Sequence, residues 1–278
     1  MSDKEYIIKE SDVLVGSALL KKKDVNYHRV NYMVDNIQMN KSFDYLKKNS
    51  DEKDFQTLKK ILIKKYLDYR NAWNNQPSLS IFNKLSSQEF KKNKTIPLCL
   101  DIETAALCDL ACPFCFREYT ATPDKIIDEK VCYDLIDQAA DIGIPSIKFN
   151  WRGEPLLHPK LPDFIQYAKS KGILETIINT NATNLKDKLA ERLIESGLDY
   201  IIYSFDGGTK ATYEKMRPGR FKKNLFENVY NNIKNFKLLK DKMKSKFPYT
   251  KIQMILMKET FKEKKDFFNL FNDYVDDV

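Results

Sequence analysis

Short apolar runs alternate with amphipathic stretches from residue 95 onward. The runs lie at 98–103, 146–151, 176–180, 200–205 and 251–257. Between them apolar residues recur three and four positions apart, for example over 161–168 before Gly172 and over 185–194 before Gly197. The runs predict strands and the spaced residues predict helices. Strands that alternate with helices indicate βαβ units and an α/β fold with a parallel sheet, either barrel-like or doubly wound.

Polar and turn residues follow each of the first four predicted strands. They are Glu103-Thr104, Arg152-Gly153-Glu154-Pro155, Asn179-Thr180-Asn181 and Asp206-Gly207-Gly208. In parallel α/β folds the carboxyl ends of the strands share one edge, and functional sites lie there. We therefore expect these segments to converge on a single rim.

Residues 1–94 show a different pattern and are expected to form a helical, lysine-rich N-terminal extension. Apolar residues at helical spacing predict a helix over 54–70, and the earlier part has a weaker pattern. The polar stretch 74–94 is interpreted as a linker to a core of residues 95–278.

Composition narrows the class of protein. The chain has 278 residues, of which 42% are hydrophobic and 31% charged, as in a soluble globular protein. Its apolar runs are too short to span a membrane, and MSDKEYIIKE at the N-terminus does not resemble a secretory signal, so a cytoplasmic location is expected. The net charge of +8 lies mostly in residues 1–94, where lysines are mixed with Asn, Ile and Tyr. This mixing favours a solvated face over a nucleic-acid surface.

Three of the five cysteines lie within eight residues, in ETAALCDLACPFCFREYT at 103–120. Cys108, Cys112 and Cys115 are spaced by four and three positions, while Cys99 and Cys132 are isolated. Three thiolates suit an iron–sulfur cluster in which one iron stays open to another ligand. A structural zinc site is the alternative, because it could take a fourth ligand from Cys99, Cys132 or one of the two histidines, although none is at regular spacing.

Several segments together resemble the radical S-adenosylmethionine superfamily. CDLACPFC at 108–115 is similar to its CxxxCxxC loop, including the aromatic Phe114, and NWRGEP at 150–155 is similar to its Gly-Gly-Glu-Pro segment, with Arg152 in place of the first glycine. FDGG at 205–208 and TYEKMRPG at 212–219 resemble the segment that follows the fourth strand in members with a C-terminal SPASM or twitch domain.

The resemblance implies a partial (β/α)6 TIM-like barrel with a four-iron four-sulfur (4Fe-4S) cluster on Cys108, Cys112 and Cys115. It implies S-adenosylmethionine as cofactor, cleaved after electron transfer from a flavodoxin or ferredoxin type of donor. The resulting deoxyadenosyl radical abstracts hydrogen from a substrate. The barrel excludes water and holds the radical beside one C–H bond.

The same resemblance assigns cofactor-binding residues. These are Phe114, Gly153, Glu154, Asn179, Ser204 and Arg217. Glu154 is expected to meet the cofactor's ammonium group and Arg217 its carboxylate. Structural alternatives are an exposed turn at Glu154 and a solvated helix-end position for Arg217.

Local alternatives remain for other polar residues. Asn179 or its neighbours could cap a helix, Asn184 could cap a helix that begins at Leu185, and Ser204 could satisfy a backbone group. His158, before a proline, is interpreted as a surface turn residue.

Residues 274–278 are interpreted as the lead-in to a sixth strand, so the chain is expected to stop before the barrel and the SPASM-type domain are complete. Three functions remain open. The first is peptide or protein modification by radical chemistry, and the second is the same chemistry on a small molecule such as a sugar or cell-surface precursor. The third is a non-enzymatic metal-binding interaction module.

Overall fold

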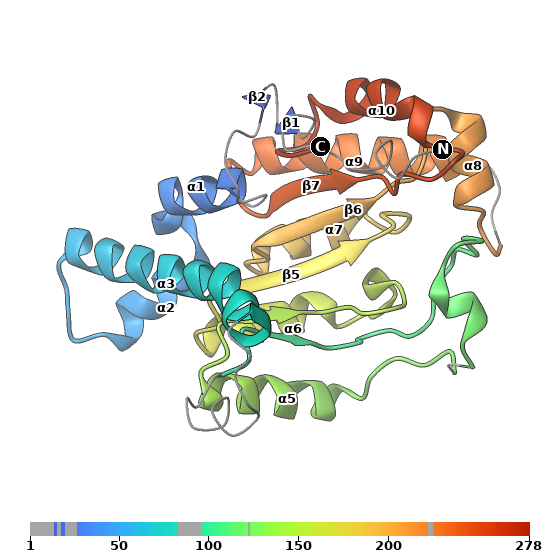
Figure 1. The fold of residues 1–278 in the computed structure, drawn as a ribbon. Coiled ribbons are helices and arrows are strands. Elements are labelled where there is room, and N and C mark those ends of the chain that lie inside the picture. The colour runs from blue at the N-terminus through green and yellow to red at the C-terminus, as the bar shows by residue number, and fades with distance from the viewer. Residues whose placement is uncertain (1–13, 16–17, 20–26, 83–95, 122, 222–224) are drawn as a thin grey trace.

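The computed structural model describes residues 14–15, 18–19, 27–82, 96–121, 123–221 and 225–278. A parallel sheet of five strands lies at its centre (Figure 1). The strands are β3 (Cys99–Asp101), β4 (Ser146–Lys148), β5 (Glu175–Thr180), β6 (Tyr200–Ser204) and β7 (Tyr249–Gln253). Their order in the sheet, β3-β4-β5-β6-β7, is their order in the chain. The order never reverses, so the doubly wound alternative is wrong and the barrel-like interpretation is confirmed.

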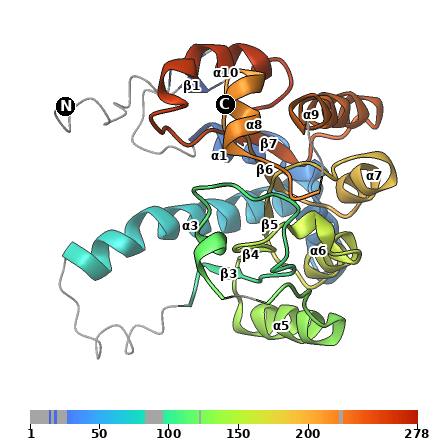
Figure 2. The same cartoon turned by 90° about the vertical axis from the view of Figure 1, so that its right-hand side faces the viewer.

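Helices cover the outer face of this sheet, as both views show (Figures 1 and 2). They are α5 (Glu129–Ile142), α6 (Leu161–Ser170), α7 (Asp187–Glu195) and α9 (Leu225–Lys242). The shorter helices α8 (Lys210–Met216) and α10 (Lys264–Phe271) lie beyond the ends of β6 and β7. Three 3₁₀ turns complete this part: η4 (Phe116–Tyr119), η5 (Pro155–Leu157) and η6 (Phe261–Glu263).

The strands alternate between the two faces of the sheet. Ile147, Ile178, Ile201 and Ile252 are fully buried in the main core under the helices. Residues an odd number of positions away, such as Lys148, Asn179 and Ser204, face the barrel interior and line cavities there. Polar residues inside an otherwise apolar strand thus mark the inner wall of the barrel.

The described part of residues 1–94 includes three helices, with the 3₁₀ turn η3 (Ile37–Met39) between the first two. They are α1 (Tyr27–Asp35), α2 (Lys41–Asn49) and α3 (Phe55–Phe82), preceded by the short strands β1 (Leu14–Val15) and β2 (Ala18–Leu19). The helix predicted over 54–70 is confirmed. The linker over 74–94 is wrong for its first part, since α3 continues to Phe82, and residues 83–95 lie outside the described residues. Polar residues misled the prediction because the exposed turns of a helix are polar.

A buried carboxylate joins the extension to the amino end of the sheet. Glu175, at the start of β5, accepts hydrogen bonds from the hydroxyls of Tyr66 (3.1 Å) and Tyr69 (2.9 Å) of α3. It is also within 3.5 Å of the Arg29 guanidinium and 3.9 Å of that of Arg70. Although burial disfavours the charged guanidinium, the adjacent Glu175 holds the pKa of Arg29 above its ordinary value. The extension therefore closes the end of the sheet opposite the predicted site.

Residues near the C-terminus lie beside β7. Asp277 forms a parallel bridge with Lys251, and the Ile252 N–H donates to the Asp277 carbonyl at 2.9 Å. This segment occupies the side of β7 away from β6, where the next strand of a barrel is expected.

Candidate functional site

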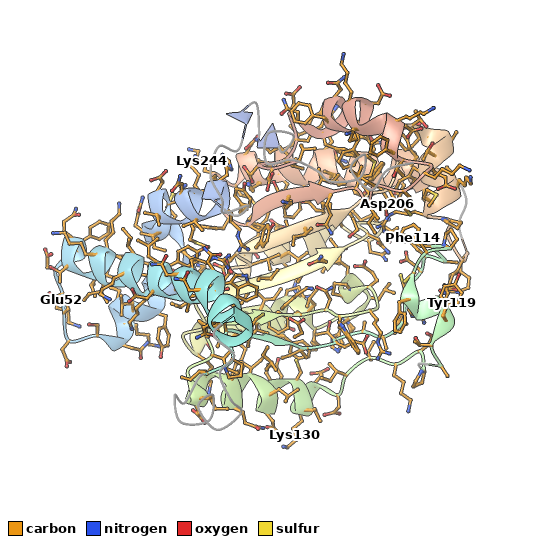
Figure 3. All side chains as sticks on the ribbon, viewed as in Figure 1. Glu52, Phe114, Tyr119, Lys130, Asp206 and Lys244 are labelled. Atoms are coloured by element: carbon orange, nitrogen blue, oxygen red, sulfur yellow. The ribbon has the colours of Figure 1, made fainter. Side chains whose placement is uncertain are left out.

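A cavity of about 350 Å³ lies at the carboxyl edge of the sheet, and we call it the rim cavity. All three clustered cysteines and all six predicted cofactor-binding residues line it. Its lining includes Cys108, Cys112, Phe114, Cys115, Asn150, Gly153, Glu154, Asn179, Asn181, Ser204 and Arg217. These residues come from five separate segments of the chain. In Figure 3, Phe114 and Asp206 are labelled at this same edge.

The cysteines lie on the long loop between β3 and α5, which is fastened at several points. Leu110 pairs with Gly219, and the Ala111 N–H donates to the Pro218 carbonyl at 2.8 Å. The Cys115 N–H donates to the Cys112 carbonyl at 3.0 Å, which forms a turn between the last two thiols. These contacts hold the loop at the carboxyl edge of the sheet, in front of the strand ends in Figure 2.

The thiols suit a cluster better than a single metal ion. A structural zinc ion needs four ligands, and among the described residues no group of three or more His, Cys, Asp or Glu that could hold one ion is recorded. A 4Fe-4S cluster takes one thiolate per iron, and the three cysteines that line this cavity provide three such ligands. Burial raises the pKa of the Cys108 thiol to about 12 and that of Cys112 to about 11. Bound iron would supply the positive charge that these thiolates need.

Gly153 is required because the cysteine loop passes directly over it. A Cβ atom at this position would lie 2.0 Å from the Ala105 carbonyl oxygen and 2.7 Å from that of Leu107. The neighbouring Glu154 N–H donates to the Leu107 carbonyl at 2.9 Å. The Gly-Glu-Pro segment thus acts as a backbone support for the loop that carries Cys108.

We predict that Gly153→Ala displaces the cysteine loop and lowers the iron content per chain several-fold, because backbone atoms cannot yield as a flexible side chain would. Overpacking of this kind costs about 1–3 kcal/mol. Gly143→Ala is the matched control. It is strained by a φ of +86°, but its Cβ would meet only one side-chain atom of Ile96, at 3.9 Å. Equal iron content in the two variants would contradict the support role.

Glu154 is buried, so the exposed-turn alternative is wrong. Its Oε1 accepts from the Leu156 N–H (3.0 Å) and the Thr180 hydroxyl (2.7 Å), and its Oε2 accepts from the Asn181 N–H (2.7 Å). Burial raises its pKa to about 7, against the lowering effect of these hydrogen bonds. Glu154 therefore ties the end of β5 to the segment after β4, beside the thiols.

Arg217 is also buried, which overturns the alternative of a solvated helix end. Its Nε and Nη2 contact Asp206 Oδ2 at 2.7 and 2.6 Å, and its guanidinium lies 6.0 Å from the centre of the Phe114 ring. Asp206 is fully buried, and its other oxygen accepts the Ile255 N–H at 2.7 Å. The pair places a cation against the cavity wall near Cys112.

Asn179 and Ser204 face the same cavity from β5 and β6. The Asn179 backbone N–H donates to Asn150 Oδ1 at 2.7 Å. Its own side-chain Oδ1 is buried and has no partner among the described residues, which is costly unless a ligand satisfies it. Asn179 caps no helix.

Three polar residues near Cys108 were not among the site residues predicted from the sequence. Asn181 Nδ2 lies 3.8 Å from the Cys108 Sγ and donates to Asp109 Oδ1 at 2.8 Å. Thr183 donates its hydroxyl to the other Asp109 oxygen at 2.6 Å. In the sequence, Asp109 is recognisable only as a polar residue between two of the clustered cysteines. Asp206 could be noticed in the sequence because it follows a predicted strand. Its ion pair with Arg217, eleven positions later, could not be predicted from the local pattern.

Two local expectations are wrong. His158 is buried, not a surface turn residue; its Nε2 lies 3.2 Å from the Ile127 carbonyl and its Nδ1 accepts the Lys160 N–H. Asn184 is not a helix cap, because α7 begins at Asp187 and Lys186 occupies the N-cap position. The contact of His158 with Ile127 joins positions 31 residues apart, so the local pattern does not encode it. Cys99 and Cys132, as expected, do not line the rim cavity.

A family comparison agrees with this geometry. A sequence model of the Radical SAM superfamily matches residues 102–271, and the chain belongs to this superfamily of enzymes, which use a 4Fe-4S cluster and S-adenosylmethionine.

Curated relatives match over the same part of the chain. A GTP 3',8-cyclase of Chlorobaculum tepidum is 33% identical over 105 residues, which are 38% of this chain and 32% of that protein. An Fe-coproporphyrin III synthase of Methanosarcina barkeri is 34% identical over 114 residues, which are 40% of this chain and 27% of that protein. The alignments thus span about a third of the length of these relatives.

Solved structures share the fold. SuiB of Streptococcus suis bound to its precursor peptide SuiA has a TM-score of 0.53 at 19% identity, over 92% of this chain and 52% of that one. The protein anSMEcpe with bound AdoMet and a peptide has a TM-score of 0.52 at 19% identity, over 64% and 49%. At this identity the likeness shows the fold alone. Within the described residues, no helix is long and apolar enough to cross a membrane.

Proposed function

We propose that this chain carries the radical-generating site of an enzyme that abstracts hydrogen from a peptide or protein substrate. The observation that carries the proposal is the convergence of Cys108, Cys112, Cys115 and an Arg217–Asp206 pair on one cavity at the carboxyl edge of the barrel. A 4Fe-4S cluster bound there supplies the electron that cleaves S-adenosylmethionine into methionine and a deoxyadenosyl radical. The chain's own residues bind, orient and shield these groups.

Four of the lining residues have a defined task in this proposal. Arg217, fixed by Asp206, offers its remaining N–H groups to the cofactor carboxylate. Glu154 and the unpartnered Asn179 Oδ1 are acceptors for the cofactor's ammonium or hydroxyl hydrogens. Phe114 and the barrel wall limit access of water to the reacting carbon. Reducing electrons come from a small protein of the flavodoxin or ferredoxin type.

We predict that Arg217→Ala lowers the affinity for S-adenosylmethionine by about one to two decades, the value of one charge-assisted contact of roughly 1.5–3 kcal/mol. The variant also leaves Asp206 buried without a cation, which lowers stability. Binding is measured by equilibrium dialysis on iron-loaded protein.

The double variant Arg217→Ala/Asp206→Asn separates the two effects. It removes the stranded charge, while an amide oxygen can still accept the Ile255 N–H. We expect its stability to recover and its cofactor affinity to stay low. Recovery of affinity together with stability would show that Arg217 has no contact with the cofactor.

The peptide class of substrate rests on the open rim of the cavity and on the fold shared with two enzymes solved with peptides. The small-molecule alternative is favoured by curated relatives such as the GTP 3',8-cyclase. Either substrate would reach the cavity from the carboxyl edge of the strands.

The test is anaerobic reconstitution with iron and sulfide, followed by dithionite and S-adenosylmethionine. We expect deoxyadenosine and methionine in equal amounts. Iron-loaded protein that releases neither product would contradict the proposed function and leave a metal-binding interaction module.

A further inference from the structure

A second cavity, of about 440 Å³, lies inside the barrel between the rim cavity and the N-terminal helices, and we call it the inner cavity. One side is formed by Arg29 of α1 and by Tyr69, Arg70 and Trp73 of α3. The other side is formed by inward-facing strand residues. Figure 1 shows α3 crossing the open face of the sheet near the amino ends of the strands. The extension therefore builds one end of this cavity.

The two cavities share part of their lining. Lys148 of β4 and Asn179 of β5 line both. Lys148 pairs with Ile177 in the sheet register, two positions before Asn179, so both side chains are on the inner wall at successive levels. A molecule in the inner cavity could thus extend to the rim cavity along these two residues.

The inner cavity has cationic groups that the protein does not satisfy. Lys148 is half-buried, and its backbone carbonyl accepts the Ile102 N–H at 2.8 Å, but the structure records no hydrogen bond or ion pair between its side-chain ammonium and the other described residues. Arg70 is 3% exposed, and its Nε and Nη2 are buried without a partner among the described residues. A buried guanidinium with unused donors is costly unless an acceptor reaches it.

Nearby carboxylates do not fill this need. Glu175 approaches Arg70 only through Nη1, at 3.9 Å, and already serves two tyrosines and Arg29. Asp277 is paired with Lys251 at 3.0 Å. Asp101 also lines the cavity and lies opposite Lys148 in the sheet register, but it is exposed and the contact recorded for its side chain is with the Cys99 thiol. Arg29, Arg70, Lys148 and Lys251 outnumber the three carboxylates Asp101, Glu175 and Asp277 by one, so the net charge around the inner cavity is positive.

Aromatic rings stand next to the unmatched guanidinium. Arg70 lies 5.2 Å from the centre of the Tyr69 ring and 5.3 Å from that of Trp73. Trp73 is 38% exposed although it is a large apolar side chain. Such a wall suits a ligand that has an apolar part next to its charged group.

We propose that the inner cavity binds a carboxylate or phosphate group of the substrate, with Arg70 and Lys148 as its cationic partners. The remainder of the substrate passes Asn179 and presents its C–H bond in the rim cavity. This inference rests on the proposed function and gives it a substrate class, an anionic molecule. It also gives the N-terminal extension a role in substrate binding. The anion could belong to a small molecule or to an acidic peptide.

The protein contains only two tryptophans, Trp73 and Trp151, which makes the test direct. In a Trp151→Phe background of the iron-loaded chain, fluorescence reports Trp73 alone. Phenyl phosphate, benzoate and a short acidic peptide are titrated separately, and sodium chloride at equal ionic strength corrects for screening. We expect saturable changes with at least one anion and none with salt. The probe that binds tightest identifies the source of the anion.

Two variants and a control locate the binding. Lys148→Met and Arg70→Met are each expected to weaken the tightest probe about tenfold to a hundredfold, as for a lost charge-assisted contact. If the Arg70→Met variant does not fold, the binding measured for Lys148→Met tests the inference on its own. Lys130→Met is the matched control, because that lysine is 82% exposed and pairs with Asp134 on α5. No saturable binding, or equal binding in Lys148→Met and in the control, would overturn the inference.

Failure here is distinguishable from failure of the proposed function. Deoxyadenosine formation without anion binding would refute the anion site in the inner cavity and support the proposed radical chemistry. Anion binding without deoxyadenosine formation would support the inner cavity as a ligand site and refute the proposed radical chemistry.

Discussion

Replacement of Cys108, Cys112 or Cys115 by Ala is expected to abolish the brown chromophore and all cleavage of S-adenosylmethionine. The three thiols line one cavity, and the two remaining cysteines, Cys99 and Cys132, do not line it. A cluster held by two cysteines would leave two irons without protein ligands. Iron analysis, visible absorption and deoxyadenosine formation measure the effect.

Cys99→Ala and Cys132→Ala are the controls. Cys99 lies on β3, and Cys132 is fully buried in α5 within the core. Both variants are expected to keep the cluster. Loss of iron from Cys132→Ala, with retention in Cys115→Ala, would refute the ligand assignment.

Glu175→Ala is expected to destabilise the protein by about 3–5 kcal/mol, because it leaves two buried cations without their carboxylate. Arg29 and Arg70 are 5% and 3% exposed, so water cannot replace the lost charge. A domain is stable by only about 5–15 kcal/mol, so the loss is a large part of the total. Urea unfolding followed by circular dichroism measures it.

Asp68→Ala provides the comparison on the same helix. Asp68 pairs with Lys64 at 2.6 Å, but both side chains are more than half exposed, so little change is expected. Glu175→Gln should fall between the two, since its amide oxygen can still accept from one tyrosine. If Glu175→Ala unfolded at the same urea concentration as Asp68→Ala, the extension would not depend on this carboxylate.

The fold of residues 95–278 could be predicted in outline because strand and helix periodicities are local signals. All five expected strands are present, although β4 covers only Ser146–Lys148 of the run that was predicted over 146–151. The extension was harder to predict. The sequence of α3 does not reveal that Arg70 and Trp73 face a cavity, because the residues that line the cavity with them come from strands far along the chain.

The site shows the same division between local and distant signals. Cysteine spacing and the Gly-Glu-Pro segment are local, so the three cysteines and Glu154 could be picked out from the sequence, whereas Asn181, which lines the same cavity, was missed. The pairing of Arg217 with Asp206 and the burial of His158 arise from tertiary packing. The close approach of Ala105 to Gly153 explains that glycine, but the loop and the turn lie 48 positions apart and only the fold joins them.

The most direct test of the three-cysteine site is the electron paramagnetic resonance spectrum of the reduced protein with and without S-adenosylmethionine. The account predicts the signal of a reduced 4Fe-4S cluster whose g values shift when the cofactor is added, since one iron has no protein ligand. An unchanged spectrum, or a chain that holds zinc in place of iron, would contradict it.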